Sequence, residues 1–338
     1  MIIVKDNLTG CPLVSIIILT YNQEKLVGQT ISSVAEQKTN FPYEILLADD
    51  CSTDNTKAVC IKYQEMYPDR IVVIENDKNK GLKRNYFENI SEFARGKYIA
   101  VCGGDDWWID DCKIQKQIDY LENHPECTMV HTNSYNWKHG TDIKKAKPSK
   151  NTCRDDYEKM VVQNNIMALT VCFTKKAYDA FVREIDPLNQ TLPMDDYSMW
   201  IWHSFRGKIH KMEDYTAIYR ILPNSLSHST NFLKAHHIET ERREIKMYFI
   251  NHFKTYDQNI IDQINLKCYL DTLSTTELVG DVELRNERNV FLLKHHYYLF
   301  FIIGKVYQII GKNIKLNRLF RKFDLLVKMY HPCKKYFI

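Results

Sequence analysis

The first hundred residues alternate between short apolar runs and longer amphipathic runs, and this alternation limits the fold more than any other feature. The runs LVSIIILT (13–20) and YEILLADD (43–50) are aliphatic and β-branched, which is typical of strands buried on both faces. IVVIEN (71–76) and KYIAVCGGDDWW (97–108) repeat the pattern. We therefore predict an α/β protein with a mostly parallel sheet flanked by helices, in a Rossmann-like arrangement.

Apolar residues at helical spacing fill the intervals between these strands. The expected helices cover residues 24–37, 53–68 and 82–96. A further helix is expected at 114–125, and a further strand follows it at 128–137. Short strands and helices then continue to about Ser229, and the pattern becomes mostly helical from about residue 235.

Polar side chains follow the predicted strands at their carboxyl ends, where α/β sheets bind ligands. They are Tyr21, Asn22, Asp49, Asp50, Asp105 and Asp106. Neighbouring carboxylates raise each other's pKa unless a cation offsets their negative charge. Mg²⁺ or Mn²⁺ is such a cation, because both ions prefer hard oxygen ligands. The chain has no G-x-x-x-x-G-K-[ST] or G-x-G-x-x-G motif, so we expect the metal and side chains to hold any phosphates.

The cysteines and the chain start point to a cytoplasmic protein. Ten cysteines are scattered without a C-x-x-C pair, which favours reduced thiols over a zinc site or a disulfide framework. The first residues lack the basic region of a signal peptide. The net charge of +4 is uneven, because residues 294–338 hold ten Lys or Arg and one Asp.

Four segments resemble family 2 glycosyltransferases of the GT-A fold in their order and spacing. They are VSIIILTYNQEKLVGQTISSVAEQ, YEILLADDCSTDNT, NKGLKRN and GKYIAVCGGDDWW, which together cover about residues 12–135. The resemblance implies a nucleotide sugar as donor, with UDP as the expected nucleotide. It also implies a divalent cation bound by a D-x-D-type motif and inversion of the anomeric centre.

Carried over position by position, the resemblance assigns the nucleotide site. Thr20 and Tyr21 would lie beside the base, and Asp50 would accept a hydrogen bond from it. Arg84 would lie near the base or a phosphate, and the alternative for Arg84 is a solvated helix start. Gly81 would permit a tight turn before it.

The segment after the second strand has two interpretations. Ser52, Thr53 or Asp54 is suited to cap the following helix. The resemblance also allows Asp49, Ser52 and Asp54 to contact the donor. Both interpretations stay open.

In CGGDDWW, the resemblance makes Asp106 the metal ligand and Asp105 the partner of the ribose or of a metal-bound water. The chain departs from many relatives at Gly103, where they carry a further acid, so the cation is expected to have fewer carboxylate ligands. Trp107 and Trp108 are expected to pack under the loop and wall the sugar pocket, with a core position for at least one of them.

Inverting transfer needs a general base for the acceptor hydroxyl. In LPMDDYSMWIWHSFRGKI, Asp196 matches the late acidic motif of the family and is the expected base, whereas Asp195 would cap the next helix. Downstream, Arg220 or His228 could meet the diphosphate, although a surface role is expected for His228.

The division into domains places a GT-A domain at 1–235 and a mostly helical, basic region at 236–338. The segment 291–338 mixes aromatic, aliphatic and basic residues, and its apolar run YYLFFII is shorter than the roughly 20 residues that span a bilayer. The segment is expected either to bind an anionic membrane surface or to serve as a helical cap or dimer contact, which leaves oligomerisation open. No nucleic-acid partner is expected.

The expected function is that of a metal-dependent, inverting glycosyltransferase. Its acceptor would be a glycan or a lipid-linked glycan in bacterial surface polysaccharide or lipopolysaccharide synthesis, a setting that rests on the family resemblance alone. One alternative is a nucleotidyltransferase or phosphohydrolase that uses the same acidic strand ends. Another is a binding module that has lost turnover.

Overall fold

The computed structural model describes residues 2–5, 10–138, 141–145, 157–191, 196–222, 231–273, 275–295 and 298–310. The chain forms two compact units, Met1–Ile221 and Leu222–Ile338, which we call the sheet unit and the helical unit. The boundary expected from the sequence, after residue 235, falls inside a helix of the helical unit. Assignment of separate roles to the two parts stays a prediction.

Four parallel strands form the first half of the sheet, as the sequence predicts. They are β2 (Val14–Thr20), β3 (Tyr43–Asp49), β4 (Ile71–Glu75) and β5 (Tyr98–Gly103). Their spatial order is β4-β3-β2-β5, and the short β1 (Ile2–Lys5) pairs antiparallel with β4. β2 lies between β3 and β5, with its carboxyl end beside both of theirs. The loops after β2, β3 and β5 therefore meet at one edge.

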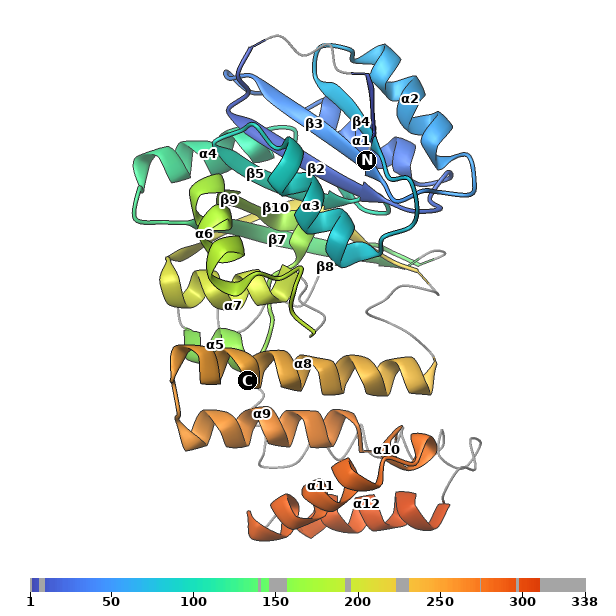
Figure 1. The fold of residues 1–338 in the computed structure, drawn as a ribbon, viewed down its shortest axis with the longest axis vertical. Helices are drawn as coiled ribbons and strands as arrows, with labels where there is room; N and C mark the ends of the chain where they lie inside the picture. Colours follow the sequence, from blue (N-terminus) through green and yellow to red (C-terminus); the bar gives the residue numbers. More distant parts are fainter. Residues whose placement is uncertain are drawn as a thin grey trace. The chain divides into compact units, whose positions relative to one another are not determined.

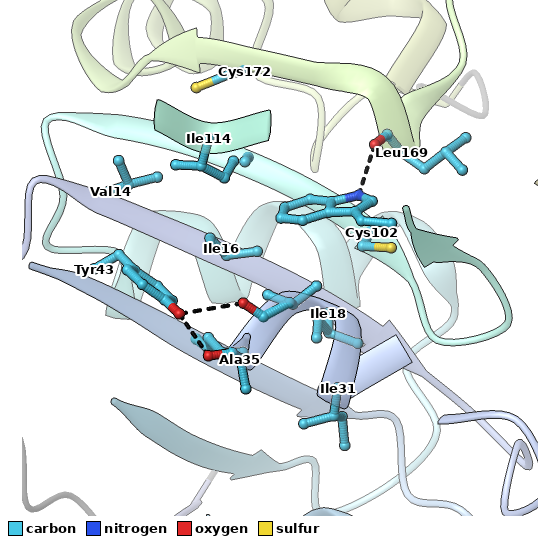
Figure 2. Close-up of a cluster of buried hydrophobic side chains, with 14 of the residues drawn as sticks. Val14, Ile16, Ile18, Ile31, Ala35, Tyr43, Cys102, Ile114, Leu169 and Cys172 are labelled. Atoms are coloured by element: carbon cyan, nitrogen blue, oxygen red, sulfur yellow. Dashed lines mark hydrogen bonds between the residues drawn. The ribbon is translucent and has the colours of Figure 1, made fainter. Parts of the chain in front are cut away.

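Helices cover both faces of these strands because successive side chains point to opposite faces. The helices are α1 (Val27–Ala35), α2 (Thr56–Met66) and α3 (Leu82–Phe93). Val14, Ile16 and Ile18 of β2 point to one face and pack with Ile31 and Ala35 of α1 in the main core (Figure 2). Figure 1 shows α3 on the opposite side of the sheet from α1.

Beyond β5 the sheet becomes mixed, which the alternating pattern did not predict. The strands are β6 (Trp107–Trp108), β7 (Met129–Lys138), β8 (Lys144–Lys145), β9 (Val171–Thr174) and β10 (Ile209–Ile221). β9 pairs antiparallel with both β5 and β7, whereas β10 runs parallel to β7. The intervening helices are α4 (Lys113–Asn123), α5 (Tyr157–Val162), the 3-10 helix η1 (Ala168–Thr170), α6 (Lys175–Ile185) and α7 (Asp196–Arg206).

The helical unit contains α8 (Phe232–Phe253), α9 (Gln258–Asp271), α10 (Thr275–Val279), α11 (Val282–Lys294) and α12 (Tyr298–Ile310). Its apolar core comprises Leu266, Leu270, Leu273, Leu292, Phe300, Ile303 and Tyr307. Within the described ranges, no helix combines the length and the apolar character that crossing a membrane requires.

Candidate functional site

Asp105 and Asp106 lie in the turn between β5 and β6, at the carboxyl edge of the sheet. Asp106 is buried, and its Oδ1 accepts a hydrogen bond from the backbone N–H of Arg220 on β10, at 2.8 Å. The hydroxyl of Thr30 on α1 lies 2.6 Å from the Asp106 carbonyl oxygen and 2.9 Å from that of Gly104. A strand and a helix distant in sequence thus fix the acidic turn.

Both carboxylates face the space above Gly103. A Cβ atom at Gly103 would lie 2.9 Å from Asp105 Oδ1 and 3.4 Å from Asp106 Oδ2. The glycine therefore leaves room where the two carboxylates converge, and a third acid at this position would need part of that room. A pair of hard oxygen donors beside an open space fits Mg²⁺ or Mn²⁺, with water and ligand oxygens completing the coordination.

The electrostatics of this pair also fit a cation. Burial raises the pKa of Asp105, and it raises the pKa of Asp106 well above its ordinary value. The charge of Asp105 adds to the rise in the pKa of Asp106, whereas the hydrogen bond and charge of Arg220 oppose it. A divalent cation would favour the charged form of both carboxylates.

Arg220 brings a positive charge to the same place. The residue is only 3% exposed, its Nη2 donates to Gln29 Oε1 at 2.6 Å, and its guanidinium carbon lies 4.6 Å and 5.6 Å from the ring centroids of Trp107 and Trp137. Nε and Nη1 are buried, and neither has a hydrogen-bond partner among the described residues. Such donors cost free energy unless an acceptor arrives, so they are suited to an anionic ligand.

The two tryptophans that follow the acids have different positions. Trp108 belongs to the core, where its Nε1–H donates to the Leu169 carbonyl at 2.9 Å. The buried ammonium of Lys113 lies 4.1 Å from the Trp108 ring centroid. Trp107 instead packs on Arg220 and contacts Trp137 edge to face.

Thr20, Tyr21 and Asp50 are the residues predicted to lie beside the nucleotide base. Thr20 ends β2 and is buried, whereas Tyr21 is 44% exposed. Asp50 follows β3, and its carboxylate shapes a neighbouring loop. Oδ1 accepts from the Asn76 side chain at 2.7 Å and from the Lys80 N–H at 2.8 Å, and Oδ2 accepts from the Gly81 N–H at 2.9 Å. A hydrogen bond from a nucleotide base to Asp50 stays a prediction.

The N-cap prediction for α2 was wrong by one residue, because Asn55 occupies that position. Ser52 instead donates to Asp49 and accepts from the Asn22 N–H at 2.9 Å. Asp54 accepts from the Thr56 N–H in the first helical turn and from the Glu24 N–H. These side chains join the loops after β2 and β3 because the two strand ends are adjacent.

The segment before α3 contains the predicted glycine turn. Gly81 has φ of 78° and precedes the helix. Arg84 is half-exposed and its Nη1 pairs with Glu88 on the same helix at 2.7 Å. This arrangement corresponds to the solvated helix position weighed above, and a donor contact for Arg84 stays a prediction.

Asp196 begins α7, with its Oδ1 accepting from the Tyr197 N–H at 2.8 Å. The buried Trp200 and the Trp202 Nε1–H, which donates to Glu184 at 2.9 Å, hold this helix in the sheet unit. Asp195 and His228 lie outside the described residues.

No sequence pattern predicted the contributions of Gln29, Thr30 and Trp137 to this site. Gln29 and Thr30 sit on an ordinary amphipathic helix, and their partners are distant in sequence, so no local signal marks them. Trp137 lies near the carboxyl end of β7, where the strand-end rule could have found it.

A second acidic group lies between β6 and α4. Among the described residues, oxygen and sulfur atoms of Asp110, Asp111 and Cys112 lie within 4.8 Å of one another. Asp111 pairs with Lys38 and Asp110 with Lys116. Lysines therefore already compensate this group.

A family model described as "Glycosyl transferase family 2" matches residues 15–178. These residues belong to that family, and the surrounding architecture is the GT-A fold.

An uncharacterized protein of Mycobacterium tuberculosis is 30% identical over 217 residues, which are 64% of this chain and 60% of that protein. The chain thus spans less than two thirds of that relative. The Escherichia coli protein WfaP, named as a UDP-Glc:α-D-GlcNAc-diphosphoundecaprenol β-1,3-glucosyltransferase, is 29% identical over 70% of this chain and 92% of its own length.

Solved structures share the fold at low sequence identity. TarS from S. aureus, in complex with UDP-GlcNAc, superposes with a TM-score of 0.54 at 15% identity, covering 88% of this chain and 90% of that one. The mannosyltransferase PcManGT from Pyrobaculum calidifontis, in complex with GDP-Man and Mn²⁺, gives a TM-score of 0.53 at 15% identity, with 89% and 88% covered.

Proposed function

We propose that the protein is a metal-dependent, inverting glycosyltransferase that moves a sugar from a nucleoside diphosphate to a hydroxyl of a glycan or glycolipid. The observation that carries the proposal is the Asp105–Asp106 pair, of which Asp106 is buried, beside the guanidinium of Arg220, whose Nε and Nη1 are unpartnered within the described chain. Such a site offers ligands for a cation and donors for an anion at once. A metal-bound diphosphate requires both.

Different residues of the site bind different parts of the donor. Asp106, assisted by Asp105, would hold Mg²⁺ or Mn²⁺. When bound, the cation would offset negative charge on the diphosphate as a Lewis acid, which would make the diphosphate a better leaving group. Arg220 donates hydrogen bonds from Nε and Nη1 to phosphate oxygens. The nucleotide base lies against Thr20, Tyr21 and Asp50.

Asp196 acts on the acceptor. It takes the proton of the acceptor hydroxyl as that oxygen attacks the anomeric carbon, and the bond from this carbon to the diphosphate oxygen breaks. The nucleoside diphosphate leaves from the opposite face, so a single displacement inverts the anomeric centre. The position of Asp196 at the start of α7 supports this role, since a helix N-terminus stabilises a carboxylate.

The comparisons support a choice of substrates. UDP-GlcNAc in TarS and UDP-Glc in the name of WfaP favour a UDP-sugar, and Mn²⁺ in PcManGT favours a manganese-type site. The diphosphoundecaprenol acceptor of WfaP favours a lipid-linked glycan. We place the reaction in cell-surface polysaccharide or lipopolysaccharide synthesis, on the cytoplasmic side of the membrane.

The test measures nucleoside diphosphate release from a panel of UDP- and GDP-sugars with Mn²⁺. We expect EDTA to abolish release and Asp106→Asn to lower it by about 100-fold or more, since a lost metal ligand removes several kcal/mol of transition-state stabilisation. Asp110→Asn is the matched control, because Asp110 belongs to the lysine-paired group, and it should stay within about twofold.

Two outcomes would contradict the proposal. Release that persists in EDTA would rule out the metal role of the acidic pair. Formation of pyrophosphate or free phosphate in place of a nucleoside diphosphate would favour a nucleotidyltransferase or a phosphohydrolase.

A further inference from the structure

Helix α12 buries apolar side chains on one side and exposes an apolar side chain on the other. Its inner side packs Phe300, Ile303 and Tyr307 into the core of the helical unit. On the outer side, Ile302 is 57% exposed and lies next to the partly buried Phe301. Exposed apolar side chains beside charged ones mark an interaction surface.

The end of α11 also exposes apolar side chains. Val290 and Leu293 are 67% and 43% exposed, on the side of α11 away from the buried Leu292. The two helices pack on each other and are consecutive in the chain (Figure 1). We call Val290, Leu293 and Ile302, together with the exposed Lys294 and Lys305, the α11–α12 surface.

The positive charge around this surface favours an anionic partner. Lys294 and Lys305 are the first two of the ten basic residues in 294–338, a segment with one acid. The exposed acids Glu283 and Glu287 lie in the first half of α11, and Glu287 pairs with Arg243 at 3.1 Å. A second copy of the chain would bring the same positive charge, so self-association through this surface is opposed electrostatically.

We propose that the α11–α12 surface binds the interface of an anionic lipid bilayer. The apolar side chains enter the boundary between headgroups and acyl chains, and the lysines contact anionic headgroups. At 13 residues, α12 can lie in the interface but is too short to span a membrane. This proposal goes beyond the proposed catalytic function and does not depend on it.

The test is cosedimentation of the full chain with vesicles of phosphatidylcholine alone or with about one third phosphatidylglycerol. We expect binding to the anionic vesicles that weakens as salt screens the charges. Leu293→Glu with Ile302→Glu should lower the vesicle partition constant by about tenfold or more, because two apolar contacts become charged. Met66→Glu is the matched control, since Met66 is 56% exposed on α2 of the sheet unit.

A second variant distinguishes a loss of vesicle binding from misfolding of the chain. Lys305→Glu changes one exposed charge and should weaken binding to anionic vesicles only. Donor hydrolysis in solution should be unchanged in all these variants, so failure of this proposal is distinguishable from failure of the catalytic one. Equal binding of wild type and the double Glu variant would overturn the proposal. Conversion of a wild-type dimer to a monomer by Ile302→Glu, without vesicle binding, would show a surface between two copies instead.

Discussion

Arg220 contributes to the site through both its backbone and its side chain. Its backbone N–H fixes Asp106, and its side chain presents two buried donors beside the same carboxylate. The guanidinium keeps its orientation because Gln29 holds Nη2 while Trp107 and Trp137 lie against it. Orientation of this kind lowers the free-energy cost of binding a diphosphate.

Trp137 can therefore be tested as a positioning residue. We expect Trp137→Ala to raise the Kd for UDP by about 2- to 30-fold, the range that a lost cation–π contact allows. The affinity for uridine should be unchanged because it has no phosphate. Trp137→Phe keeps a ring and should restore most of the UDP affinity. An equal loss for UDP and uridine would mean that the substitution acts through the fold, not through Arg220.

At the scale of elements, helix α1 organises the acidic turn. The Thr30 hydroxyl reaches the carbonyls of both Gly104 and Asp106, and α1 also packs against the main core strands. The polar residues after the predicted strands placed the acids at the correct edge of the sheet, because the carboxyl ends of adjacent parallel strands lie at the same edge. This reasoning could not identify the contact with Thr30, since that contact depends on how α1 packs on the sheet.

Thr30→Val tests this contact with a side chain of nearly the same shape. We expect the free energy of unfolding of the sheet unit to fall by about 1–3 kcal/mol, because two buried carbonyl groups lose their donor. Affinity for Mn²⁺ should fall with it, measured by isothermal titration calorimetry. Thr30→Ser keeps the hydroxyl and should retain the metal affinity. If Thr30→Val binds Mn²⁺ as the wild type does, α1 does not position the acidic turn.

At the scale of the whole molecule, the sheet unit holds two histidines in their neutral form, the fully buried His203 and the partly buried His131. Burial lowers the pKa of His131 to about 4 and that of His203 to about 3. Unfolded histidine titrates near 6.5, so between these values the unfolded chain binds protons that the folded chain does not. Each histidine therefore contributes stability that is complete above about pH 6.5 and falls by about 1.4 kcal/mol per unit as the pH drops.

Urea unfolding followed by tryptophan fluorescence measures this effect, because all five tryptophans belong to the sheet unit. The raised pKa values of Asp105 and Asp106 act in the opposite direction, so the informative quantity is the difference between variants. We expect His203→Phe to lose less stability than the wild type between about pH 6.5 and 5. His237→Phe, in the helical unit, should match the wild type. Equal acid sensitivity of wild type and His203→Phe would contradict the assignment of a buried neutral imidazole.

The sequence by itself determined the order of strands β2 to β5 and of helices α1 to α4, the parallel arrangement of these strands and the edge at which the acids gather. It did so because apolar periodicity and strand-end polarity are local properties of the chain. The tertiary structure alone decided that β9 returns antiparallel, that α2 begins directly after Asn55, and that Thr30, Gln29 and Trp137 support the acids and Arg220. These features arise from contacts between residues far apart in sequence, and no local pattern encodes which side chains packing will bring together.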